Sequence, residues 1–271
     1  MDQAFLFDAN LRALRRARAA LNTPEAGFLF HEGAEALADR LSFIKREFEQ
    51  AVFHGLDFGA LEAALPTMQP KDRILAETEA WPLEAQSCDL ILSNLQLHWV
   101  NDLPGLLIQI RQSLRPDGFF SACLIGGESL FELRAALAQA ETDLGLPSHP
   151  RVSPMIDVPT AASLMQRAGF ALPVVDHEVI PVSYQHPLTL LNDLRAMGQT
   201  NALAAQPRGI DPRAFWPQVM AAYEALFPHP GGGVQATFDL IFLSGWAPGP
   251  GQQTPLAPGS AMQDLAAALK S

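Results

Sequence analysis

Residues 86–122 read QSCDLILSNLQLHWVNDLPGLLIQIRQSLRPDGFFSA, and this stretch decides the fold. Apolar runs at residues 89–93 and 119–125 each predict a buried strand. Between the two runs, residues 102–114 carry a helical pattern, with Asp102 placed as its N-cap. A strand, a helix and a strand joined by short connections indicate a parallel sheet with crossover helices, so the fold class is α/β.

Local signals around this unit predict where other elements begin. Residues 115–118, RPDG, are typical of a turn. Residues 129–141 predict a helix that opens with Ser129 and Glu132 in the spacing of a capping box. Residues 234–245 alternate and predict a final strand with a hairpin partner nearby. The other expected elements are helices at residues 8–21, 29–46, 59–65, 159–168, 187–197, 211–226 and 261–269, short strands at 51–53 and 73–76, and an extended segment at 172–182.

The composition describes a chain that can bury a large core. It has 271 residues, of which 48% are hydrophobic and 17% charged, which suits one large domain or one domain with an insertion. Its 29 acidic residues against 18 Lys and Arg give a net charge of −11. Such a surface repels phosphate backbones, so we expect no nucleic-acid partner, and a basic partner would suit it better.

The cysteines and the lengths of the apolar runs indicate in which cellular compartment we expect the protein. Cys88 and Cys123 lie within apolar stretches, and neither has a second Cys or a His at metal-ligand spacing. They predict two buried thiols in a reducing compartment and no metal site. No apolar run reaches the ~18–20 residues that span a bilayer, and Asp2 and Asp8 interrupt a signal-peptide pattern. We expect a cytoplasmic protein without a membrane span, with peripheral membrane association left open.

The first predicted helix carries a basic, acid-free stretch. Two interpretations stay open: a solvated helix face, or a faint similarity to an organelle transit peptide. The arginines concerned are Arg12, Arg15, Arg16 and Arg18. The helical period places the apolar face on Leu11, Leu14, Ala17 and Leu21.

Several blocks of the sequence stand together in the order of one known family. They resemble the methyltransferase-like assembly factor 5 family of respiratory complex I, in its alphaproteobacterial form. The wider relatives are class I S-adenosylmethionine-dependent methyltransferases, including the enzyme that methylates malonyl-carrier protein in biotin synthesis. The blocks are LHWVNDLPG (97–105), LRPDGFF (114–120), GGESLFELR (126–134), SPMIDV (153–158), RAGF (167–170), DLRAMGQTNAL (193–203), ATFDLIFLSGWAP (236–248) and QQTPLAPGSA (252–261).

The resemblance implies a Rossmann-like class I methyltransferase fold. This fold has a mainly parallel sheet, an antiparallel last strand, helices on both faces and, in this family, a helical insertion. We expect N-terminal helices over residues 1–46, a methyltransferase-like domain over 47–248 with the insertion at 183–228, and a C-terminal arm at 249–271. The family further implies a role in maturing a complex I subunit, and arginine hydroxylation rather than methylation has been ascribed to it.

The segment after the first strand departs from the family pattern. Relatives carry D-L-G-x-G there, where glycines let the backbone approach the cofactor. In this chain Phe53 takes the place of the Asp, Gly55 is kept, and Asp57 replaces the second glycine. A second register, over residues 56–59, again lacks the second glycine. The Asp57 carboxylate would also repel the carboxylate of S-adenosylmethionine.

The chain is also too short between the first strand and the next strand candidate. Ala76 stands only 17 positions after Gly59, whereas one βαβ unit takes about thirty residues. We therefore expect one strand–helix unit to be missing, together with the carboxylate that holds the ribose. Two lost charge-assisted hydrogen bonds of about 1.5–3 kcal/mol each would weaken cofactor binding by about two to four orders of magnitude.

The residues carried over from the family form two groups. For the cofactor, S-adenosylmethionine, they are Gly55, Asp57, Glu77, Thr78, Ser93 and Asn94. For a substrate or partner face they are Trp99, Tyr184, Arg195, Asn201 and Trp246, with plain packing as the equal alternative.

His98 and Asn94 are the candidate catalytic residues. They follow the strand whose C-terminal end faces the transfer pocket in this fold. His98 would act as a general base. The alternative is that His98 and Trp99 anchor the helix that follows them.

Two functions follow from these observations. The first is a non-catalytic relative, a chaperone or scaffold with a degenerate cofactor site that binds a protein partner, such as a complex I subunit. The alternative is an active S-adenosylmethionine-dependent enzyme, a methyltransferase or an arginine-modifying enzyme, that acts on a protein. A small-molecule methyltransferase like the biotin-pathway enzyme is a third and weaker interpretation.

Overall fold

A six-stranded sheet in the order β2-β1-β3-β4-β6-β5 organises the molecule. The computed structural model describes residues 5–19, 27–55, 58–74, 80–205 and 209–252. Strands β1 to β4 run parallel, while β6 is antiparallel to both β4 and β5. This confirms the predicted Rossmann-like sheet with its antiparallel last strand. The strands are β1 (Ala51–Gly55), β2 (Asp72–Ile74), β3 (Cys88–Asn94), β4 (Leu114–Ile125), β5 (Ala171–Tyr184) and β6 (Val234–Trp246).

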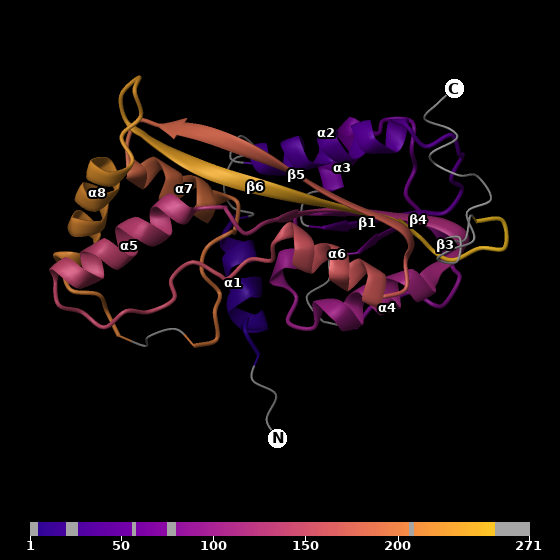
Figure 1. Ribbon diagram of the computed structural model, residues 1–271, viewed down its shortest axis with the longest axis horizontal. Helices are drawn as coiled ribbons and strands as arrows, with labels where there is room; N and C mark the ends of the chain where they lie inside the picture. Colours follow the sequence, from indigo (N-terminus) through magenta and orange to yellow (C-terminus); the bar gives the residue numbers. More distant parts are fainter. Residues whose placement is uncertain (1–4, 20–26, 56–57, 75–79, 206–208, 253–271) are drawn as a thin grey trace, which may run out of the picture.

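The central strands are apolar because both faces of the sheet are covered. Every residue of β3 is buried, as expected for a parallel strand between two helical layers. Alternate side chains enter different clusters: Leu90 packs with α2 (Phe28–Ser42) and α3 (Phe58–Ala64), and Ile91 packs with the opposite layer. That opposite layer consists of α4 (Leu103–Ser113) and α6 (Val158–Arg167) (Figure 1).

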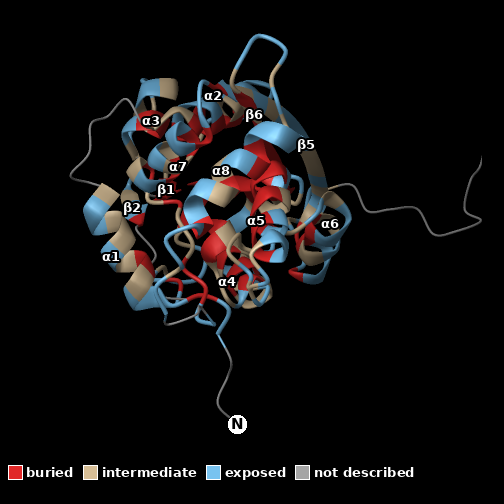
Figure 2. Cartoon of the chain, turned by 90° about the vertical axis from the view of Figure 1, so that its left-hand side faces the viewer, coloured by how far each residue is buried: buried red, intermediate tan, exposed pale blue. Residues whose placement is uncertain are grey.

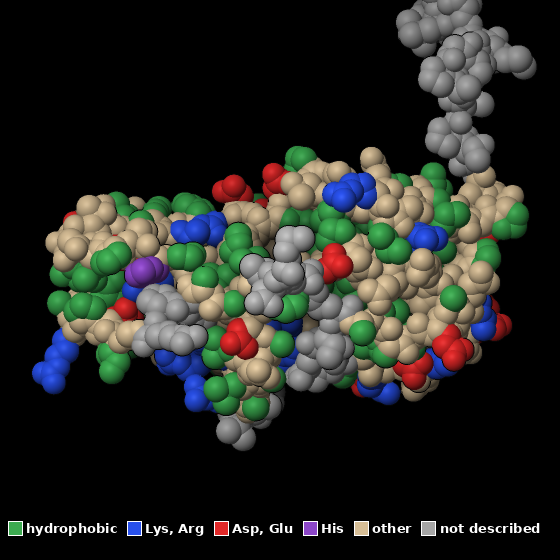
Figure 3. Space-filling view, turned by 90° about the horizontal axis from the view of Figure 1, so that it is seen from below, with side chains coloured by type: hydrophobic (Ala, Val, Ile, Leu, Met, Phe, Trp, Pro, Cys, Tyr) green, Lys and Arg blue, Asp and Glu red, His purple; other side chains and the backbone are tan. Residues whose placement is uncertain are grey.

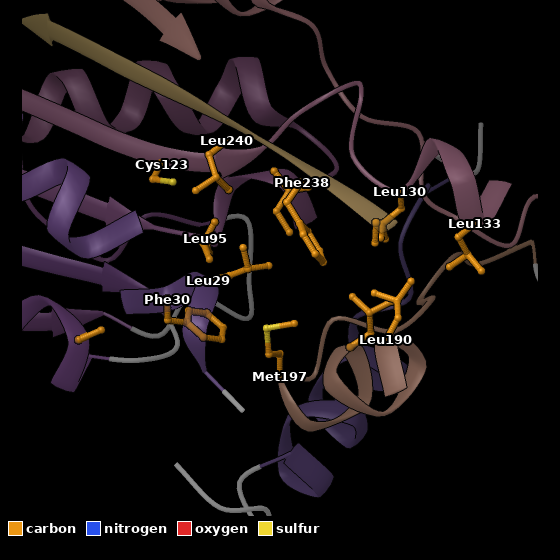
Figure 4. Close-up of a cluster of buried hydrophobic side chains, with 14 of the residues drawn as sticks. Leu29, Phe30, Leu95, Cys123, Leu130, Leu133, Leu190, Met197, Phe238 and Leu240 are labelled. Carbon is orange, nitrogen blue, oxygen red and sulfur yellow. The ribbon is translucent and has the colours of Figure 1, made fainter. Parts of the chain in front are cut away.

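A second group of helices lies at one end of the sheet, where β5 and β6 extend beyond the parallel strands (Figure 1). Its inward surfaces are buried and its outer surfaces exposed (Figure 2). Buried side chains from α2, α5, α7 and β6 meet there in one apolar cluster (Figure 4). The helices are α1 (Ala9–Ala19), α5 (Phe131–Asp143), α7 (Pro187–Ala196) and α8 (Phe215–Leu226).

The predicted insertion at 183–228 contributes α7 and α8 to this group, and α8 packs on α5, which precedes the insertion. The domain boundaries themselves stay predictions. Of the predicted C-terminal arm, residues 249–252 are described, and the predicted helix at 261–269 lies outside the described residues. In the described part of the chain, no helix combines the length and the apolar character that crossing a membrane requires.

On the side of β1 that faces away from β3, the described residues form one strand, β2. β2 pairs directly with β1, with Val52 opposite Asp72 and His54 opposite Ile74. This agrees with the prediction that one strand–helix unit is missing. Of the strand predicted at 73–76, residues 75 and 76 lie outside the described residues.

Two local predictions were wrong in an instructive way. The turn predicted at 115–118 lies inside β4, where the register against β3 shifts and Asp117 adopts a φ of +60°. The turn signal therefore marks a bulge in a strand, which bends the strand without ending it. The apolar face predicted for the first helix was also wrong, because Leu14 is 47% exposed and Arg12 only 8%.

The predicted capping box is absent from the start of α5. Glu132 is buried and accepts hydrogen bonds from the backbone N–H and the hydroxyl of Thr237, at 3.1 and 2.5 Å. Ser129 Oγ accepts from the Asp239 N–H at 2.8 Å and donates to the Asp239 carbonyl. Both side chains therefore join α5 to β6, with Leu130 in a left-handed conformation at the junction.

We predict that Glu132→Gln lowers the free energy of unfolding by about 2 kcal/mol, because a charge-assisted pair of hydrogen bonds is lost in a buried place. Urea denaturation followed by circular dichroism measures the change. Glu128→Gln, on an exposed side chain of the same segment, is the matched control and should shift the midpoint little. Equal stability of the Glu132 variant and the wild type would contradict the structural role of this carboxylate.

Candidate functional site

The C-terminal ends of β1 and β3 lie side by side, with His54 opposite Ser93 and Gly55 opposite Asn94. His54 Nδ1 lies 2.8 Å from Ser93 Oγ, and both side chains are fully buried. Gly55 has a φ of +157°, and a Cβ at this position would lie 2.7 Å from the Asn94 carbonyl oxygen. The approach of β1 to β3 is therefore sufficient to require a glycine at this position.

Asn94 is held by helix α2. Its amide Nδ2 donates to the Phe30 carbonyl at 2.8 Å, and the side chain is 1% exposed. A Cβ on Gly33 would lie 2.5 Å from Asn94 Oδ1, so α2 rests directly on this amide. Figure 4 shows Phe30 close to Leu95, the residue that follows β3. The predicted catalytic Asn94 thus lies under a helix and is closed off from solvent.

At this edge the Ser93 hydroxyl and the Asn94 amide N–H are engaged within the protein. His54 Nε2 and Asn94 Oδ1 are buried and have no hydrogen-bond partner among the described residues. The amino acid and ribose groups of S-adenosylmethionine need free donors and a free carboxylate. Gly55 has no room toward β3. The three other predicted cofactor residues, Asp57, Glu77 and Thr78, lie outside the described residues.

A 3₁₀ turn, Leu97–Trp99, follows β3 and carries the candidate base. The indole Nε1 of Trp99 donates to Gln199 Oε1 at 2.7 Å, and His98 Nε2 lies 3.1 Å from the same oxygen. An indole N–H can only donate, so the oxygen of the Gln199 amide must face both rings. His98 Nε2 must then carry the proton, which leaves Nδ1 as an acceptor.

Burial lowers the pKa of His98 to about 4. The ring is therefore neutral near pH 7, with its lone pair on Nδ1. So low a pKa gives it little driving force as a general base. The hydrogen bonds of His98 and Trp99 go to Gln199 rather than to α4, so the two rings position the segment around residue 199.

The arginines of α1 face this same place. Arg12 Nη1 donates to the Trp99 carbonyl at 3.0 Å, and its guanidinium lies 5.4 Å from the centre of the Trp99 ring. Arg15 Nη1 donates to Thr200 Oγ1 at 2.5 Å. The predicted solvated face is thus wrong for Arg12, which is buried. The signal available in the sequence was the acid-free spacing of arginines at positions 12, 15 and 16.

A cavity of about 380 Å³ opens beside His98, between α1, α5, α7 and the segments 151–155 and 199–201. We call it the arginine cavity, because Arg15, Arg151 and Arg195 line it. The structure brings four of the predicted residues together here: His98, Trp99, Arg195 and Asn201. Sequence reasoning missed Arg15, Gln199 and Thr200.

The other predicted partner residues do not line this cavity. Tyr184 is buried in the apolar cluster at the end of β5, where burial raises the pKa of its hydroxyl. Trp246 lies at the other end of the strands, beside the beginning of β4, where its ring centre is 4.6 Å from that of Phe119. Because β6 is antiparallel to β4, its C-terminal end meets the beginning of β4, so Trp246 cannot share a site with His98.

Comparison with known proteins places these features in a family context. The family model for the methyltransferase domain matches residues 38–122. The chain is 34% identical to the mitochondrial arginine-hydroxylase NDUFAF5 of Danio rerio, over 84% of this chain and 70% of that protein. Identity to the mitochondrial arginine-hydroxylase NDUFAF5 of Homo sapiens is 32%, over 94% of this chain and 81% of that protein.

Further matches are a curated methyltransferase and a solved structure. The malonyl-[acyl-carrier protein] O-methyltransferase of Laribacter hongkongensis is 29% identical over 92% of each chain. The solved structure of the YcgJ protein of Bacillus subtilis has a TM-score of 0.47 at 12% identity, over 79% of this chain and 98% of that one.

We predict that the protein loses stability as the pH falls below about 6.5. Burial, aided by Arg12 and Arg16, lowers the pKa of His54 to about 3, and burial lowers that of His98 to about 4. Between those values and the ordinary value near 6.5, the unfolded chain takes up protons that the folded protein does not. Each histidine then costs about 1.4 kcal/mol of stability per pH unit.

Urea denaturation at pH 7.5, 6.0 and 5.0 measures this slope. His54→Asn should flatten it, because one of the two histidines is removed. His31→Asn, at an exposed position of α2, serves as the control and should keep the wild-type slope. An unchanged slope for the His54 variant would show that this ring does not govern the acid sensitivity.

Proposed function

The chain belongs to the methyltransferase-like family of complex I assembly factor 5, and we propose that it acts as a scaffold or chaperone in respiratory complex I assembly. In this proposal its S-adenosylmethionine site is degenerate. One observation carries the degeneracy: the Ser93 hydroxyl and the Asn94 amide N–H, where β3 ends, are used within the protein. Ser93 pairs with a buried His54, and the amide of Asn94 binds α2.

The sequence of the first loop adds to this support. Asp57 stands where relatives keep a second glycine, and the chain is short by one strand–helix unit on that side. The described ends of β1 to β3 are Gly55, Ile74 and Asn94, so none of them supplies the carboxylate expected for a nucleoside. The helical group and the sheet, which a scaffold needs, bury large apolar clusters.

The proposed partner is a protein, in the first place a complex I subunit, and we place the encounter in the cytoplasm. Cys88 and Cys123 are buried and free, as suits a reducing compartment. A net charge of −11 favours a basic partner and disfavours nucleic acid. If the partner is a membrane-embedded subunit, this protein would associate peripherally with the same membrane.

One observation favours a second candidate, an active S-adenosylmethionine-dependent methyltransferase or arginine-modifying enzyme that acts on a protein. A cavity opens beside His98, whose Nδ1 is an acceptor. The positive charge of the cavity disfavours binding of an arginine substrate, because Arg15 and Arg195 would repel the guanidinium of that substrate.

We predict that S-adenosylmethionine does not saturate the wild-type protein below about 1 mM, because the loss of two charge-assisted bonds weakens binding by about two to four orders of magnitude. Isothermal titration measures this. Asp57→Gly restores the second glycine and should tighten binding, whereas Asp57→Ala removes only the charge. A micromolar dissociation constant for the wild type would overturn the degenerate site.

We predict that a strain lacking this protein has less assembled complex I, and that His98→Gln restores assembly as well as the wild type does. Glutamine keeps an N–H that can donate to Gln199 but supplies no base. Native gels and NADH oxidation by isolated membranes are the readouts. Full complex I in the deletion strain would refute the assembly role, and failure of a folded His98→Gln variant would favour the enzyme.

A further inference from the structure

We propose that the arginine cavity binds a small carboxylate that carries an apolar chain, such as a medium-chain fatty acid. The carboxylate would lie between Arg15 and Arg195, and the chain would lie along the wall formed by α5, α7 and β6. This inference goes beyond the assembly role and does not depend on it.

The two cations at the cavity are not balanced by carboxylates. Among the described residues, Arg15 donates to the hydroxyl of Thr200 at 2.5 Å, and Arg195 donates to the amide oxygen of Asn192 at 3.2 Å. Both acceptors are neutral. Desolvation also lowers the pKa of Arg15. A partly buried guanidinium that lacks a counter-charge favours the binding of an anion.

The third arginine is already balanced. Arg151 binds Asp211 through two hydrogen bonds of 3.1 and 2.7 Å, and Glu141 through a third of 3.0 Å. Two carboxylates thus share one guanidinium, so this cluster carries a net charge of about −1 and offsets one of the two positive charges of Arg15 and Arg195. The excess charge on the cavity comes from α1 and from the last turn of α7.

The opposite wall of the cavity is apolar. Figure 4 shows Leu130, Leu133 and Phe238 gathered near Leu190 of α7, and the first three line the cavity. Figure 3 shows arginine side chains beside a gathering of hydrophobic side chains at the end of the molecule formed by α5 and α8. A ligand with one anionic end and one apolar end satisfies both walls. The further apolar lining residues are Ile125, Leu137, Leu191 and Leu194.

The volume of the cavity and the neutral His98 beside it further limit the class of ligand that would bind. A volume of about 380 Å³ is at the small end of ligand cavities, which suits one short chain better than a nucleotide. His98 is neutral at physiological pH, so it adds no third cation that a doubly charged phosphate would favour. A single carboxylate matches the two arginines.

The experiment titrates the purified full chain with decanoate below its micellar concentration, and follows binding by isothermal titration and by shifts in the NMR spectrum. Decanoate should bind saturably. Decanol, which has the same chain without the charge, should bind at least ten-fold more weakly. Decyltrimethylammonium, with the opposite charge, should not bind. Equal affinity for decanoate and decanol would overturn the proposal.

Substitutions of single arginines test which side chain binds the carboxylate of decanoate. Arg15→Gln and Arg195→Gln should each weaken decanoate binding by about ten-fold or more, since one charge-assisted hydrogen bond is worth about 1.5–3 kcal/mol. Arg18→Gln, exposed on the same helix as Arg15, is the matched control and should bind as the wild type does. Arg195 is exposed, so its variant is expected to fold even if the Arg15 variant does not. Wild-type affinity in the Arg195 variant would refute the assignment.

Fatty acids of two lengths test whether the alkyl chain lies along the apolar wall of the cavity. Leu191→Phe narrows this part of the cavity, so it should weaken binding of decanoate while hexanoate binds as before. An equal loss for both acids would place the chain elsewhere and contradict the proposal. These outcomes are independent of complex I assembly, because the His98→Gln complementation tests that role without the ligand.

Discussion

Two N–H donors, from Trp99 and His98, converge on one oxygen atom of Gln199, and the functional end of the molecule depends on this contact. It fastens a segment that follows α7 to the turn that leaves β3. Thr200, the next residue, then meets Arg15 of α1. Gln199 and Thr200 thus fix the relative positions of the turn after β3, the segment after α7 and the first helix, and these three contribute to the lining of the cavity.

The same contact assigns a chemical state to His98. A histidine that donates through Nε2 and is desolvated stays neutral, so it serves positioning better than proton transfer at neutral pH. The ends of β1 and β3 show a similar preference for internal contacts, with Asn94 bound to α2 and Ser93 bound to His54. These hydrogen bonds hold β1, β3 and α2 together at the end of the sheet.

Much of the fold was readable from the sequence, because the deciding signals are local. The strand predicted at 89–93 is β3 with one more residue at each end, and Asp102 caps α4 as expected by accepting from the Gly105 N–H. The site was less readable, because its partners are far apart in the chain. Ser129 and Glu132 have the spacing of a capping box, yet their partners on β6 lie 110 and 105 residues away. Likewise, the inward face of α1 is decided by Trp99, which no periodicity within α1 can reveal.

The position of α1 has a consequence for how the protein is made. Arg15 and Thr200 are 185 residues apart in sequence, and the Asp8 N–H donates to the Ala202 carbonyl. At about 5–20 residues per second, the ribosome delivers that partner about 10–40 s after the helix itself. During this interval the arginine-rich helix emerges without the surface that it finally covers. Docking of α1 therefore waits until the segment around Thr200 has been synthesised.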